Sequence, residues 1–396
     1  MSMNEQMKES ETSILHTYNR FPVVFEKGQG CYLYDSEGKE YLDFAAGIAV
    51  NSLGYHYPGY DEALKDQIDK LMHISNLYYN EPIIDAGAKL VKASKMSKAF
   101  FTNSGTEAIE GALKAAKKYA YVRDGHADHE IIAMNHSFHG RSIGALSVTG
   151  TAHYREPFEP LMGGVKFADF NDLESVKAQI TDKTCAIITE VVQGEGGIYP
   201  AKKEFLEGLR QICDEKDIML IFDEIQCGMG RTGHYFAWQA YGVQPDIMTS
   251  AKALGCGVPV GAFVLGEKAA KASLEPGDHG TTYGGNPFVC AAVSKVFDIY
   301  ENDKIIEHVQ EMTPYLEQKL DEIVAKHECA ATRRGMGFMQ GIVIQGRPVG
   351  EVVKAALAKG LLVISAGSDV LRIVPPLVIT KEHIDNMAAI LDECME

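Results

Sequence analysis

Residues 218–226 read IMLIFDEIQ, an unbroken apolar run that ends in two acids. A short apolar run without polar alternation is typical of a strand that is buried on both faces. Helical patterns, such as the one over 203–216, separate this run from others like it. The candidate strands lie at 98–102, 130–135, 165–168, 185–191, 218–223, 246–250 and 261–265. This alternation predicts an α/β fold with a mostly parallel central sheet that helices cover.

The regions on either side of this pattern predict a second, smaller domain. Three short strands separated by turn signals, at 23–26, 31–35 and 41–44, indicate an antiparallel meander. A long helical stretch and shorter α and β segments follow Pro287. A chain of 396 residues usually forms more than one core. We therefore expect a large domain over 55–287 and a small α+β domain built from 1–54 and 288–396.

The composition excludes several classes of partner and site. The net charge of −16, from 38 basic and 54 acidic residues, argues against a nucleic-acid or anionic-membrane partner. The eight cysteines form no C-x-x-C pair, so no zinc or other metal site is expected. Scattered cysteines, a polar N-terminus and the lack of an apolar run of about 18 residues predict a cytoplasmic protein with reduced thiols.

Polar residues follow several of the predicted strands, where parallel sheets bind their ligands. Ser104, Gly105 and Thr106 open a helix, and the amides of a first turn suit a phosphate, although a plain helix cap needs the same residues. Asp223 ends its apolar strand, where a carboxylate needs a cationic partner such as a metal or a protonated heterocycle. An ordinary loop acid is the alternative.

Lys252 follows the strand at 246–250 and has small or apolar neighbours in SAKALG. Desolvation disfavours an ammonium group and leaves a free amine that can attack a carbonyl carbon. A surface lysine that extends its amine into water is the commoner arrangement.

Two further segments offer aromatic, cationic and hydroxyl groups. In FHGR at 138–141, Phe138 can stack on a flat ring and Arg141 can bind a carboxylate; a core ring beside a surface arginine is the alternative. The loop TTYGGNP at 281–287 contributes Thr281, Thr282 and glycine amides, which suit an anion or simply form a flexible connection.

Arg372 lies within the apolar segment LRIVPP at 371–376. A guanidinium in such surroundings requires a carboxylate. That carboxylate could come from a substrate or from Glu195 in QGEGG at 193–197, and a purely structural ion pair is the alternative.

The order of these groups is more specific than any one of them. A phosphate site, a stacking ring, a buried acid and a reactive lysine appear in turn, each after a predicted strand. A phosphate, a flat ring, a ring nitrogen and an aldehyde together describe pyridoxal phosphate (PLP).

The chain resembles the class III (subgroup II) aminotransferases of fold-type I over essentially its whole length. The motifs are SGTEA at 104–108, FHGR at 138–141, QGEGG at 193–197, DEIQ at 223–226, SAKALG at 250–255 and TTYGGNP at 281–287. Within that family the segments at 42–58, 157–161 and 371–380 look like the acetylornithine group of arginine biosynthesis.

The resemblance implies roles for individual residues. Lys252 would bind PLP covalently as a Schiff base and would be catalytic together with Asp223, which would bind the pyridine nitrogen. Phe138 would stack on the ring, Gln226 would approach its phenolic oxygen, and Thr282 would reach the phosphate in the partner subunit of a homodimer. The implied cofactor-binding set is Ser104, Gly105, Thr106, Phe138, Asp223, Glu224, Ile225, Gln226, Lys252 and Thr282.

The resemblance also implies a reaction, in which the δ-amino group of N-acetylornithine passes to 2-oxoglutarate. Arg141 and Thr281 would contact the donor. Arg372 would bind the α-carboxylate of glutamate, and Glu195 would pair with Arg372 when a different amino donor is bound. Ile48 stands where ornithine enzymes carry tyrosine, which disfavours free ornithine.

Several alternatives remain open at this point. Succinylornithine and 4-aminobutyrate aminotransferases share the catalytic motifs. A non-catalytic PLP-binding regulator would normally carry a basic DNA-binding extension or lack the lysine. A nicotinamide dehydrogenase would need G-x-G-x-x-G, whereas residues 99–106 read AFFTNSGT.

Overall fold

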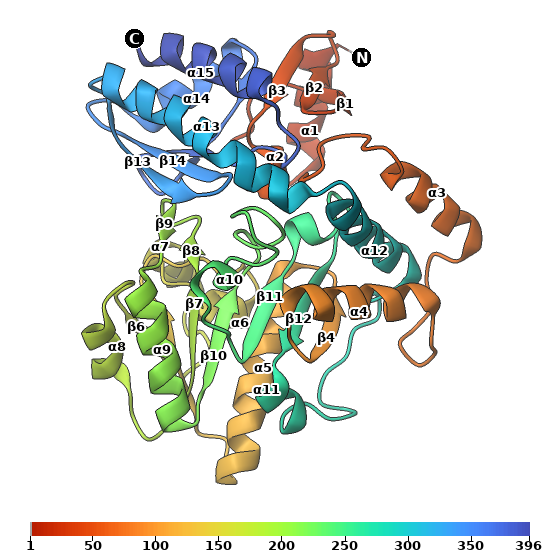
Figure 1. Ribbon diagram of the computed structural model, residues 1–396, viewed down its shortest axis with the longest axis vertical. Helices are drawn as coiled ribbons and strands as arrows, with labels where there is room; N and C mark the ends of the chain where they lie inside the picture. The colour runs from red at the N-terminus through yellow and green to blue at the C-terminus, as the bar shows by residue number, and fades with distance from the viewer. Residues whose placement is uncertain (1) are drawn as a thin grey trace.

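A seven-stranded sheet forms the centre of the computed structural model, which describes residues 2–396 (Figure 1). The strand order is β4-β12-β11-β10-β7-β5-β6. Strand β12 runs in the direction opposite to the other six, which are parallel to one another. The strands are β4 (Lys98–Thr102), β5 (Glu130–Met134), β6 (Val165–Ala168), β7 (Thr184–Glu190), β10 (Met219–Asp223), β11 (Ile247–Ser250) and β12 (Gly261–Leu265). The predicted α/β fold with a mostly parallel sheet is confirmed.

The two middle strands β7 and β10 are buried along their whole length. Leu220 and Phe222 pack into an apolar cluster that includes Leu209 of α9 (Lys203–Lys216). Ile221 packs into a second cluster with Ile109 of α5 (Gly105–Asp124). Apolar residues on both faces of the strands are therefore explained by helices on both faces of the sheet.

Short helices complete the layers around this sheet, and α5 begins where β4 ends. Ser104 caps α5, and Gly125 ends it in the left-handed conformation, with φ of 77°. The remaining helices of this part are α3 (Tyr60–Lys70), α4 (Glu81–Ser94), α6 (Ile143–Ser147), α7 (Ala152–Arg155), η1 (Glu156–Phe158), α8 (Leu173–Gln179), α10 (Trp238–Tyr241), η2 (Lys252–Leu254) and α11 (Glu267–Lys271).

The two ends of the chain meet in one sheet at the same end of the molecule (Figure 1). The meander β1-β2-β3 is extended by β15, which runs parallel to β3. These strands are β1 (Phe25–Gln29), β2 (Tyr32–Asp35), β3 (Glu40–Asp43) and β15 (Leu361–Leu362), preceded by α1 (Met3–Ser13) and followed after β3 by α2 (Ala46–Ala49).

A second four-stranded sheet, in the order β13-β14-β17-β16, lies beside three helices of the C-terminal region. Its strands are β13 (Ala330–Met336), β14 (Met339–Ile344), β16 (Ile364–Ala366) and β17 (Val370–Ile373), and the helices are α13 (Ile305–Lys326), α14 (Val349–Ala358) and α15 (Lys381–Met395). A short hairpin of β8 (Val192–Gln193) and β9 (Tyr199–Pro200) contacts β13.

The structure differs from the sequence-based expectation after residue 287. The long helical stretch predicted after Pro287 consists of two helices, because Lys304 adopts a left-handed φ of 53° between α12 (Pro287–Asn302) and α13. The domain boundary at 287/288 stays a prediction, since α12 packs against α3 and α4. None of the helices within residues 2–396 has both the length and the apolar character needed to span a bilayer.

Candidate active site

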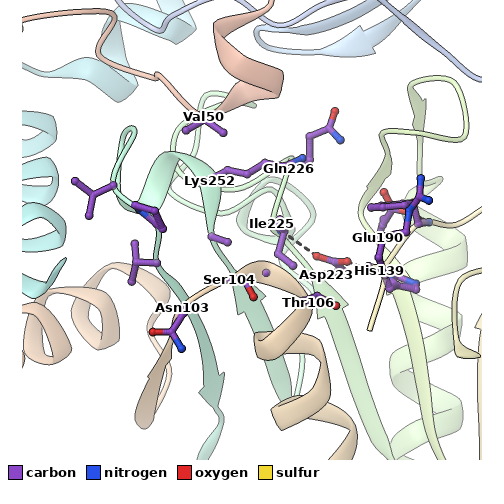
Figure 2. A pocket seen from close by; sticks show the side chains of 18 of the residues that line it. Val50, Asn103, Ser104, Thr106, His139, Glu190, Asp223, Ile225, Gln226 and Lys252 are labelled. Atoms are coloured by element: carbon purple, nitrogen blue, oxygen red, sulfur yellow. Dashed lines mark hydrogen bonds and ion pairs between the residues drawn. The ribbon is translucent and has the colours of Figure 1, made fainter. Parts of the chain in front are cut away.

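A cavity of about 520 Å³ lies at the carboxyl ends of the strands of the large sheet (Figure 2). Segments that are far apart in the sequence meet in its wall. Of the residues singled out in the sequence, those that line it are Ser104, Gly105, Thr106, Phe138, Arg141, Asp223, Ile225, Gln226 and Lys252. The predicted phosphate site, stacking ring, buried acid and lysine therefore surround one space.

Asp223 lies at the floor of this cavity and is 4% exposed. One carboxylate oxygen, Oδ2, is 2.7 Å from Nδ1 of His139, and Oδ1 accepts hydrogen bonds from the hydroxyl of Thr249 and the amide of Ile225. Three donors from three segments thus fix the orientation of the carboxylate. A carboxylate held in this way, without an arginine or lysine bonded to it, suits a cationic nitrogen of a ligand.

Lys252 follows β11 and is the first residue of η2. Its φ of 51° is in the left-handed region, which is strained for a residue with a side chain. Burial lowers the pKa of its ammonium group, although the Glu195 carboxylate acts in the opposite direction. The shift makes it easier to form the free amine, which is the form that can attack a carbonyl carbon.

The start of α5 is where the phosphate site was predicted. Amides of a first helical turn have no acceptor within the helix, and the helix dipole favours an anion there. A Cβ at Gly105 would lie 2.9 Å from Cδ1 of Ile225, so glycine keeps this approach open. The Thr106 hydroxyl is 2.8 Å from that of Ser142, and the Ser104 hydroxyl accepts from the amide of Glu107 as an ordinary cap.

Phe138 and Arg141 form one aromatic and cationic group at the side of the cavity. The Arg141 guanidinium lies 5.4 Å from the centre of the Phe138 ring and 4.1 Å from that of Tyr154. The two rings hold the exposed guanidinium by cation–π contacts and leave its edges free for a carboxylate.

Arg372 reaches the same region from β17 and is 3% exposed. Its Nη1 lies 2.5 Å from Oε1 of Glu195, its Nη2 lies 3.2 Å from Oε2, and Nη1 also donates to the side chain of Gln226. Burial by itself would raise the pKa of Glu195, but the charge and hydrogen bond of Arg372, together with Lys252 and Gln226, outweigh it and the net direction is down. The ion pair joins the second sheet of the molecule to the wall of the cavity.

Glu195 and Arg372 do not line this cavity themselves but hydrogen-bond to Gln226, which does. Three further predicted substrate or partner residues also do not line it. Ile48 is 44% exposed and has a left-handed φ of 64°. Thr281 accepts a hydrogen bond from the side chain of Asn103, and Thr282 beside it is exposed on the same loop. Their predicted roles are therefore not met by contacts within one chain.

Glu224, which the resemblance placed among the cofactor-binding residues, does not line the cavity. Its two carboxylate oxygens accept from the amides of Ala237 and Trp238, both at 2.8 Å, at the start of α10. Successive residues at the end of a strand point to opposite sides, so Glu224 turns away when Asp223 faces the cavity. Glu224 is fully buried, and burial raises its pKa to about 7.

Two buried residues of the wall were not among the sequence-based candidates. His139 contacts Asp223 directly, and Glu190 lies at the end of β7, beside Asp223 in the strand register. The signal for Glu190 was present in the sequence, because it ends an apolar strand as Asp223 does. His139 stood inside the FHGR motif, but only the fold shows which acid it meets.

Comparisons with known proteins agree with this geometry. The family model described as aminotransferase class-III matches residues 14–395. The acetylornithine aminotransferase of Clostridium acetobutylicum is 47% identical over 98% of this chain and 100% of its own length. The succinylornithine transaminase of Yersinia pseudotuberculosis is 44% identical over 94% of this chain and 92% of its own.

A solved structure gives the same result at the level of the fold. The N-acetylornithine aminotransferase of Stenotrophomonas maltophilia superimposes with a TM-score of 0.84 at 35% identity, over 98% of each chain. The match of the family model covers nearly the whole sequence, and the cavity holds a group for each part of PLP. This chain belongs to the class-III aminotransferases, which are PLP-dependent enzymes.

Proposed function

We propose that this enzyme transfers the δ-amino group of N-acetylornithine to 2-oxoglutarate, giving N-acetylglutamate semialdehyde and glutamate. The observation that carries the proposal is the different state of two arginines near Lys252. Arg372 is neutralised by Glu195, whereas Arg141 is exposed and held only by aromatic rings.

The two arginines suit two substrates of different shape. N-acetylornithine carries its carboxylate far from the reacting amine, so Arg141 is suited to bind it while Glu195 keeps Arg372 occupied. 2-Oxoglutarate carries a carboxylate beside its reacting carbon, and this group would displace Glu195 and bind Arg372 bidentately. One site can thus accept both molecules through the exchange of a single ion pair.

The residues present fit PLP at each of its polar groups. The α5 amides would hold the phosphate, Asp223 would bind the pyridine nitrogen, Gln226 would approach the phenolic oxygen, and Phe138 would stack on the ring. When bound, PLP supplies an electron sink for charge at the reacting carbon.

Within this frame Lys252 is proposed to move the proton. Its amine would remove a proton from the substrate carbon and deliver it to the carbon of the cofactor on the far side of the transferred nitrogen, as general base and then general acid. The lowered pKa of Lys252 supports this role, because an unprotonated amine is required for the first step. Arg141 and Arg372 would hold the two substrates so that the reacting carbon stays beside this amine.

We further propose a homodimer in which Thr282 reaches the phosphate of the partner's site. Exposed apolar side chains support a partner surface, since monomers rarely display such patches. They include Leu77, Tyr78 and Tyr79 at 87%, 65% and 95% exposure, and Tyr283 at 61%. A cytoplasmic location is supported by the eight unpaired cysteines.

Succinylornithine and 4-aminobutyrate remain the alternative donors. Absorbance of the enzyme-bound cofactor separates them when amines are added one at a time without 2-oxoglutarate. We expect N-acetylornithine to bleach the absorbance band of the enzyme-bound cofactor and 4-aminobutyrate to leave this band unchanged. The reason is that only N-acetylornithine would place a carboxylate at Arg141 while its amine lies at Lys252. Bleaching by 4-aminobutyrate alone would overturn the proposed donor, faster bleaching by succinylornithine would change the acyl group, and no bleaching by any amine would favour a regulator.

A further inference from the structure

Glu190 is a buried acid in the cavity wall for which the reaction above has no use. It ends β7, is 5% exposed, and is the register neighbour of Asp223 on β10. Figure 2 shows it on the same side of the cavity as His139. Its two oxygens are occupied by backbone donors, because Oε1 accepts from the amide of Phe138 at 3.1 Å and Oε2 accepts from the amide of Gly194 at 2.9 Å.

These two amides belong to the two loops that complete the site. Phe138 carries the ring that faces the cofactor space, and Gly194 directly precedes Glu195, the partner of Arg372. The loops also touch elsewhere, since the side chain of Gln193 donates to the carbonyl of Asn135 at 2.9 Å. Glu190 is the point at which one side chain holds both loops to the sheet.

We propose that Glu190 is a positioning residue that sets the Phe138 ring and the Glu195 carboxylate relative to each other. The proposal rests on the proposed function only for the role of Glu195, since the link between the loops is independent of the donor. Through Phe138, Glu190 would set the orientation of the cofactor ring. Through Glu195, it would set the relative rates of the two half-reactions.

The link requires a side chain that ends in two oxygen atoms. Two backbone N–H groups approach two different oxygens, and a glutamine offers one oxygen and would turn an NH₂ group toward the second donor. A buried donor left without an acceptor is costly. Burial raises the pKa of Glu190 to about 7, with the charges of His139 and Asp223 acting in opposite directions, so keeping an acid here is itself unfavourable. An apolar residue would avoid that cost but would release both loops.

The chain contains a matched control in Glu224. It is also buried, it also accepts from two backbone amides with its two oxygens, and burial raises its pKa to about 7. The oxygens of Glu224 bind amides at the start of α10 and not amides of the two site loops. Glu224→Gln therefore removes the same chemistry from a place outside the cavity.

The test compares Glu190→Gln and Glu224→Gln with the wild type. Amide hydrogen exchange is followed over residues 136–142 and 192–198, with and without PLP. The visible circular dichroism of the bound cofactor is recorded as a second measurement. Rates of the two half-reactions are then measured separately in single turnovers, with glutamate as the second donor. For Glu190→Gln we expect about tenfold faster exchange in both segments, the effect of one lost charged hydrogen bond. The dichroic signal should weaken and the ratio of the two rates should shift by about threefold or more.

Glu224→Gln should leave amide exchange over residues 136–142 and 192–198 at the wild-type rate, even where it lowers the melting temperature. Wild-type exchange and dichroism in Glu190→Gln would overturn the proposal, as would equal changes in both variants. If the amide variant does not fold, Glu190→Asp keeps both oxygens on a shorter side chain and must still speed exchange in the two segments. Exchange and dichroism do not depend on the donor, so a failure of the N-acetylornithine assignment leaves this result readable.

Discussion

The two walls of the cavity are built in different ways. The cofactor wall consists of groups at the ends of β4, β10 and β11, where the register of one sheet fixes Gly105, Asp223 and Lys252. The substrate wall brings Arg141 from a loop and Arg372 from a separate sheet, and an ion pair with Glu195 closes it. Backbone register gives a fixed geometry, whereas an ion pair between side chains can open for a substrate, so the two walls suit a constant cofactor and changing substrates.

The largest expected effect is at the cofactor wall. Lys252→Ala removes the amine that moves the proton, and we expect turnover to fall by at least about 10³-fold. The measurement is glutamate formation from N-acetylornithine and 2-oxoglutarate at saturating substrate. Turnover within tenfold of the wild type would show that another group moves the proton.

Asp223→Asn tests the same wall at the ring nitrogen. The amide keeps the shape but lacks the charge that pairs with a protonated nitrogen, so we expect kcat to fall by about 10²-fold or more. Steady-state kinetics should show the loss in kcat and little change in KM for either substrate. A loss confined to KM would place Asp223 in substrate binding instead.

Arg372→Lys should affect one half-reaction. A lysine cannot bind a carboxylate with two parallel hydrogen bonds, so we expect the 2-oxoglutarate half-reaction to slow by about 10- to 100-fold. The N-acetylornithine half-reaction should change by less than about threefold. Single-turnover absorbance of the two steps measures both, and equal slowing would contradict the separate roles of the two arginines.

Arg141→Lys is the reciprocal change and should be milder because the guanidinium is exposed. We expect KM for N-acetylornithine to rise by about tenfold, through loss of the bidentate contact. The 2-oxoglutarate half-reaction provides the internal control. An unchanged KM for the donor would mean that its carboxylate binds elsewhere.

The smallest expected effect is the pH dependence of stability from Glu190. Its folded-state pKa of about 7 exceeds the ordinary value of 4.5, so between these values the folded state binds more protons than the unfolded state. Its contribution is therefore full below about pH 4.5 and is lost as the pH rises toward 7, by up to about 1.4 kcal/mol per pH unit. Denaturant unfolding of the wild type minus that of Glu190→Gln measures this slope, and a flat difference would contradict the shifted pKa.

The contrast between the walls also explains what the sequence could predict. The strands that end near Thr102, Asp223 and Ser250 were identified from apolar runs, and residues that follow them were placed at one rim because parallel strands end together. The meeting of His139 with Asp223, and of Glu190 with two backbone amides, depends on side-chain directions that no spacing encodes. The same holds for Glu224, whose carboxylate binds amides at the start of α10 while that of Asp223 faces the cavity.

The region after residue 287 was less predictable. The break at Lys304 lies within the long helical stretch predicted after Pro287, and β13 is rich in charged and small residues that do not resemble a strand. Both are set by packing against neighbouring elements, which overrides local preference. The Thr282 and Ile48 assignments stay predictions, because within one chain these residues remain exposed.

Lys252 is the residue proposed to hold PLP, and borohydride reduction tests this assignment directly. The enzyme with its cofactor is reduced, digested and analysed by mass spectrometry for the peptide that gains the mass of the reduced cofactor. We predict one modified peptide, which contains Lys252, and no modification in Lys252→Ala. Modification of a different lysine in the wild type would contradict the assignment of the cofactor wall.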